Sequence, residues 1–142
     1  MRPRATRRTW LHLRAWLLLA AFTVVLRLIP IRRLKRWLIR RRQGATGTPR
    51  AASQGLEEAL EVGLVVSESA RLVPLSTCLS RALVAHLILV RHGHPSRVEV
   101  GVKREAGLFE AHAWVTCYGR IVLGDSEEYP VGAFVHLTTI NE

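Results

Sequence analysis

Hydrophobic positions follow a helical spacing before Pro95 and a strand-like alternation after it. In "LEEALEVGLVVSESARLV", residues 56–73, apolar side chains recur every three or four positions, so we predict a helix there. A second helix is predicted from Ser76 or Thr77, either of which can cap it, to Gly93. Its apolar stripe comprises Leu79, Ala82, Leu83, His86, Leu87 and Val90. Cys78 therefore falls in the first turn of this helix.

Four segments after Pro95 alternate as strands: "RVEVGVKRE" (97–105), "FEAHAWVTC" (109–117), "RIVLGD" (120–125) and "GAFVHLTTI" (132–140). Short turns join the first three, as in antiparallel hairpins. Helices followed by consecutive antiparallel strands indicate an α+β fold with the helices on one face of a sheet.

A basic, apolar arm over residues 1–42 precedes these elements, followed by a Gly- and Pro-bearing linker over 43–54. Its apolar run, 15–26, is shorter than the about 20 residues of a membrane span, and no cleavage site follows it. We predict two helical pieces hinged near Pro30. Two interpretations stay open: contact with a membrane surface or an acidic partner, or a core helix over 10–28 whose arginines face solvent.

Charge divides the chain at the same place. Residues 1–42 hold thirteen basic residues and no acidic one, whereas all eleven carboxylates lie after residue 56. The net charge of +10 therefore arises from the arm. It bears on what the arm binds and not on the chemistry of the folded domain. Nucleic acid is not expected among them, because the arginines are not interleaved with stacking aromatic residues.

The stretch from Phe109 to Asp125 predicts a hairpin whose turn is centred on Tyr118 and Gly119. In that register Cys117 faces Arg120, Val115 faces Val122, Trp114 faces Leu123 and His112 faces Asp125. Directly opposed side chains lie about 5 Å apart, so the carboxylate would orient the imidazole of His112. A three-residue loop would instead place Asp125 on the other face of the sheet.

The two cysteines differ in their expected surroundings. Cys117 lies an odd number of residues from His112, so it points to the opposite face, and a structural role is expected. Backbone N–H groups at a helix start stabilise a thiolate, which favours Cys78 as a nucleophile. Each of Cys78, His112 and Asp125 also has a plain structural interpretation: a core thiol, a strand histidine bonded to a carbonyl, and a turn residue. No histidine and cysteine spacing predicts a metal site, and no cofactor is expected.

"STCLSRALVAHLILVRHGHPSRVEVGVKRE" and "FEAHAWVTCYGRIVLGD" together resemble the transglutaminase-like cysteine protease of lasso peptide biosynthesis, the leader peptidase. That family has a "CL-x-RAL" helix start, a strand ending in "GV", an "AHAWV" strand and an Asp about a dozen residues later. Here "RHG" stands in place of the "RRG" that ends the family's helix. The resemblance is tight from Pro74 to Asp125 and loose over the helix before it.

The resemblance implies a transglutaminase- or papain-like core over residues 55–142, with Cys78, His112 and Asp125 as a catalytic triad. It implies removal of the leader from a lasso precursor peptide. The two cysteines, with no other sign of export, favour free thiols in a reducing cytoplasm, and the arm allows association with a membrane. The sequence before Leu56 is too short for a winged-helix recognition domain, so a separate leader-recognition protein and a lasso cyclase are the implied partners. Two alternatives stay open: a transglutaminase-like acyltransferase, and a non-catalytic adaptor that binds a membrane or an acidic partner through the arm.

Overall fold

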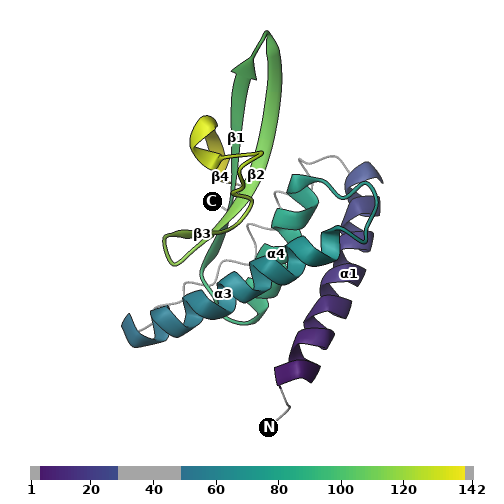
Figure 1. Ribbon diagram of the computed structural model, residues 1–142, viewed down its shortest axis with the longest axis vertical. Helices are drawn as coiled ribbons and strands as arrows, with labels where there is room; N and C mark the ends of the chain where they lie inside the picture. Colours follow the sequence, from purple (N-terminus) through teal and green to yellow (C-terminus); the bar gives the residue numbers. More distant parts are fainter. Residues whose placement is uncertain (1–3, 29–48, 140–142) are drawn as a thin grey trace.

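Three helices pack on one face of a four-stranded sheet in the computed structural model, which describes residues 4–28 and 49–139 (Figure 1). The helices are α1 (Arg4–Leu28), α3 (Pro49–Ala70) and α4 (Cys78–Arg91). The strands are β1 (Ser96–Glu105), β2 (Leu108–Cys117), β3 (Arg120–Leu123) and β4 (Val135–Thr139), and a short 3-10 helix, η1 (Val131–Ala133), precedes β4. This arrangement confirms the predicted α+β class.

The sheet is antiparallel, with strand order β3-β2-β1-β4. The long hairpin of β1 and β2 forms its centre, and β4 returns to pair with β1 rather than with β3. Figure 1 shows η1 on the side of this hairpin away from the three helices. The sheet therefore has a helix-covered face and a far face, which the 124–134 segment approaches among the residues described.

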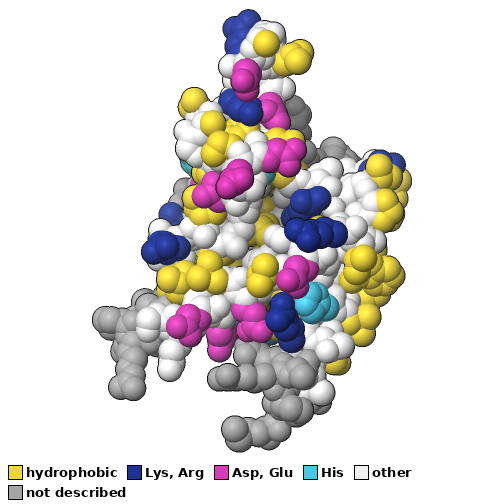
Figure 2. Space-filling view, viewed as in Figure 1, with side chains coloured by type: hydrophobic (Ala, Val, Ile, Leu, Met, Phe, Trp, Pro, Cys, Tyr) yellow, Lys and Arg dark blue, Asp and Glu magenta, His cyan; other side chains and the backbone are white. Residues whose placement is uncertain are grey.

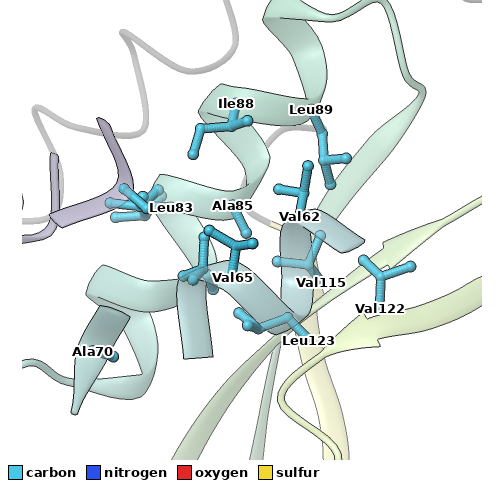
Figure 3. Packing of buried hydrophobic residues seen from close by; sticks show 14 of the residues in the cluster. Val62, Val65, Ala70, Leu83, Ala85, Ile88, Leu89, Val115, Val122 and Leu123 are labelled. Carbon is cyan, nitrogen blue, oxygen red and sulfur yellow. The ribbon is translucent and has the colours of Figure 1, made fainter. Parts of the chain in front are cut away.

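The core lies between the helices and the sheet. Helices α1, α3 and α4 contribute buried side chains, as do β1, β2 and β3. Figure 3 shows part of this packing, where side chains of α3 and α4 meet those of β2 and β3. These residues include Leu11, Ala15 and Leu19 of α1, Val62, Val65 and Val66 of α3, Leu83, Ile88 and Leu89 of α4, and Val98, Val115 and Leu123 of the sheet. Such burial supplies the main stabilising free energy of a domain of this size.

Helix α1 is part of the folded unit, because one of its faces lies in this core. This matches the core-helix interpretation for residues 10–28. The helix runs well beyond the apolar run 15–26, and Arg8–Leu28 is long and apolar enough to cross a membrane by length and composition. Helix α3 begins at Pro49, so residues 49–54 are helical rather than linker. The predicted hinge near Pro30 and the second helical piece lie outside the described residues.

Candidate functional site

Cys78 is the first residue of α4, and a capping box holds the backbone around it. Thr77 is the N-cap: its hydroxyl accepts the N–H of Ser80 at 3.2 Å, and the hydroxyl of Ser80 accepts the N–H of Thr77 at 2.9 Å. The sequence allowed either Ser76 or Thr77 as the N-cap, and in the structure the N-cap is Thr77. The free thiol is half-buried and packs against the core. It thus lies in the first turn of α4, where the backbone N–H groups have no partner within the helix.

The loop before Cys78 is held in an unusual conformation. Leu75 has a φ of 69°, which costs a residue with a Cβ on the order of 1 kcal/mol or more. The hydroxyl of Ser76 ties the loop down, because it donates to the carbonyl of Ala70 and accepts from the guanidinium of Arg81 at 3.3 Å. Arg81 lies one turn along α4 from Cys78, and its guanidinium is held by Ser76. Arg81 is the arginine of the "CL-x-RAL" motif, whereas Leu75 carries no sequence signal that singles it out.

His112 is buried on the far face of the sheet, where aromatic rings surround it. Its ring stacks on Tyr129 with centroids 5.5 Å apart, and the rings of Trp114 and Phe134 lie at 6.2 and 5.2 Å. Its Nε2 lies 2.6 Å from the carbonyl oxygen of Gly124. Because a carbonyl only accepts, Nε2 carries the proton in this contact and Nδ1 is the basic nitrogen. The plain expectation of a strand histidine bonded to a carbonyl is what the structure shows.

The alternation of β2 separates His112 from the helices. Ala113 and Val115 point into the core under α4. Because side chains alternate along a strand, His112 and Trp114 point to the far face. Cys78 belongs to α4 on the other side of the strand. In the described part of the chain, no hydrogen bond joins Cys78 to His112 or Asp125, so the structure does not show the predicted triad as a set of contacts.

The predicted hairpin register is correct at the turn and wrong beyond it. Tyr118 and Gly119 have φ values of 51° and 74°, as a tight two-residue turn requires, and Cys117 pairs with Arg120. A bulge between Val115 and Thr116 then shifts the register by one residue, so that Val115 faces Leu123 rather than Val122. β3 ends at Leu123, before Asp125 can pair with β2.

Gly124 therefore takes the place next to Trp114 and His112 that the sequence assigned to Leu123 and Asp125. A Cβ at residue 124 would lie 2.6 Å from the Cβ of Trp114, and the φ of +103° also requires glycine. Asp125 is exposed, and its Oδ1 accepts the backbone N–H of Val131 at 3.0 Å. This bond closes the loop that carries Tyr129, whose ring stacks on His112. Asp125 therefore influences His112 through the loop and not by direct contact.

Two further titratable residues, Cys117 and His86, are structural. Cys117 lies in the core, where burial raises the pKa of its thiol to about 11, so it is protonated at neutral pH. This supports the structural role expected for it. His86 is buried in α4 with its Nδ1 2.7 Å from the hydroxyl of Ser96, and burial lowers its pKa to about 4. No cluster of metal-ligating side chains occurs among residues 4–28 and 49–139.

The chain matches the transglutaminase-like superfamily over residues 19–139, which spans the C-terminal part of α1 and every later element that the structure describes. No curated protein and no solved structure matches it significantly. The match includes the helix that begins with Cys78 and the strand that carries His112, and the family favours a cysteine protease or acyltransferase activity. Since this match covers most of the sequence, the chain belongs to the transglutaminase-like superfamily.

Proposed function

We propose that this chain is a cysteine protease that removes the leader peptide from a lasso peptide precursor, with Cys78 as nucleophile and His112 as base. The observation that carries the proposal is the free, half-buried thiol in the first turn of a capped helix within a transglutaminase-like domain. The "CLSRAL" and "AHAWV" segments, which resemble the lasso leader peptidases, support the substrate class.

In the proposed reaction the Cys78 thiolate attacks the carbonyl at the junction of leader and core. His112 protonates the departing amine, and water then hydrolyses the thioester to release the leader acid. The backbone N–H of Cys78 has no partner within the helix, so it is available to stabilise the oxyanion.

The reaction requires His112 and Cys78 to meet, and they lie on opposite sides of β2 in this structure. At His112 the strand has one paired neighbour, Gly101 of β1, because the pairing with β3 ends at Val115. A strand with a single partner rearranges at lower cost than one held on both edges. We therefore propose that binding of the precursor and of a separate leader-recognition protein brings His112 to Cys78. In this proposal the reaction takes place in the cytoplasm, with a lasso cyclase as a further partner.

The test is incubation of the purified chain with the precursor peptide encoded next to it, with and without the leader-binding partner. We expect cleavage that depends on the partner, with leader and core fragments whose summed mass exceeds that of the precursor by one water. The family also allows an acyltransferase, which would join the acyl fragment to an added amine. The product would then have the mass of the amide formed from the fragment and the amine. Absence of both products in the presence of the partner would contradict an enzymatic role.

Asp125 is proposed as a positioning residue that acts through the loop closed on Val131. In Asp125→Asn the amide oxygen can still accept the N–H of Val131, so we expect cleavage within about twofold of wild type. Asp125→Ala removes the acceptor and loosens the loop whose Gly124 carbonyl holds the proton of His112 on Nε2, so we expect the base to lose its fixed tautomer and cleavage to fall by about tenfold or more. The measurement is kcat/KM of leader cleavage. Equal damage by both variants would instead indicate a direct role for the carboxylate, as in the predicted triad.

A further inference from the structure

Helix α1 presents a continuous apolar stripe on the side opposite to its buried face. The outer stripe consists of Trp10, Leu13, Leu17, Ala21, Val24 and Leu28, which follow one another at helical spacing. Its five large members expose 55% to 77% of their surface. Figure 2 shows hydrophobic side chains along the edge of the molecule where Figure 1 places α1. The helix is apolar on both faces, but the core covers only one.

The outer stripe runs along most of the length of α1. At about 1.5 Å per residue it extends for about 27 Å along the helix. Surfaces of soluble domains rarely present contiguous apolar patches of this kind without a partner. The superfamily match begins at residue 19, so the first half of the stripe lies outside the part that the family shares.

The charge of α1 indicates the chemistry of that partner. The helix sequence contains five arginines and no carboxylate, and Arg27 is exposed near the end of the stripe. Trp10 and Trp16 are both exposed, and indole rings prefer the boundary between headgroups and acyl chains. The nearest carboxylate that contacts α1, Glu68, is occupied by Arg8 at 3.4 Å and His12 at 3.3 Å. Apolar, aromatic and cationic groups together fit an anionic lipid surface.

We propose that α1 docks in the plane of an anionic membrane through its outer stripe. Although Arg8–Leu28 has the length and hydropathy to span a bilayer, spanning would withdraw Leu11, Ala15 and Leu19 from the core. Docking in the plane leaves those contacts intact and keeps the sheet, on the other side of the helical layer, in water (Figure 1). This interaction is independent of the proposed proteolysis.

The test is flotation of the full chain with vesicles of phosphatidylcholine alone and of phosphatidylcholine with phosphatidylglycerol. We expect binding to the anionic vesicles that weakens with added salt, together with a blue shift of tryptophan fluorescence. The double variant Leu13→Gln, Leu17→Gln removes the centre of the outer stripe, and we expect it to bind at least about tenfold more weakly. Both leucines are exposed, so the fold is expected to survive, which circular dichroism checks.

The matched control is Leu60→Gln, Leu64→Gln, which replaces two leucines of similar exposure, also four residues apart, on α3. This variant should bind anionic vesicles like the wild type. Equal binding by the Leu13, Leu17 variant and the wild type, or no binding of the wild type to either vesicle, would overturn the proposal. A wild-type dimer that ignores vesicles and dissociates in the Leu13, Leu17 variant would overturn it in favour of a second copy as occupant.

Discussion

Cys78→Ala is expected to abolish leader cleavage while the protein stays folded. Loss of a nucleophile removes covalent catalysis, and in comparable enzymes this costs at least about a thousandfold in kcat. The side chain is only half-buried and lies at a helix start whose capping bonds involve Thr77 and Ser80. We therefore expect thermal unfolding close to that of the wild type, and mass spectrometry of the precursor digest measures the loss of activity.

The second cysteine provides the control. Cys117→Ala removes a buried thiol on the helix-covered face of the sheet, so we expect some loss of stability and retention of cleavage. Undiminished cleavage by Cys78→Ala would rule out the proposed nucleophile.

Alkylation with iodoacetamide near neutral pH separates the enzyme from a non-catalytic adaptor. Cys78 should be labelled in the native protein, and Cys117 only after unfolding, because it is buried and its pKa is raised to about 11. Labelling without preference for Cys78 would favour the adaptor.

Gly63→Ala is expected to destabilise the fold by about 3 kcal/mol or more, although alanine is the better helix former. A Cβ at residue 63 would overlap the backbone carbonyl oxygen of Val122, where α3 crosses β3. Backbone atoms cannot rotate away as a flexible side chain can, so the helix or the strand must shift. The gain of about 1 kcal/mol in helix propensity is smaller than this cost. Urea unfolding followed by circular dichroism measures the difference.

Gly132→Ala is the matched control, because no atom lies within 4 Å of a Cβ there and the residue is not in the left-handed region. It should change the free energy of unfolding by less than about 0.5 kcal/mol. Equal stability of Gly63→Ala and Gly132→Ala would contradict a close contact between α3 and the backbone of β3.

Local signals in the sequence predicted the helix of Cys78 and the hairpin turn. Thr77 and Ser80 cap α4 through bonds between near neighbours, and Tyr118 and Gly119 adopt positive φ within a two-residue turn. Such features depend on interactions within a few residues, which the sequence contains in full. Gly63, by contrast, lowers the helix propensity of its segment, so the sequence gives no reason for a glycine there. The close crossing of α3 over β3 explains why this position has no side chain.

The candidate site was predicted less completely, because one bulge decides the register of the hairpin. The alternation of β2 predicted that Cys117 and His112 point to opposite faces, and the structure agrees. The bulge at Val115 and Thr116 leaves no signal in the residue types, yet it replaces Asp125 by the Gly124 carbonyl as the partner of His112. A shift of one residue changes every later pairing.

The sequence alone determined the α+β class, the family resemblance, the helix that begins near Cys78 and the separation of charge between residues 1–42 and the rest of the chain. Each of these follows from residue types, their periodicity or short motifs. The tertiary structure alone decided that α1 has one buried and one exposed apolar face, and that His112 lies on the far side of β2 from Cys78. Both depend on which elements pack together, because burial is a property of neighbours distant in sequence and cannot be read from a segment by itself.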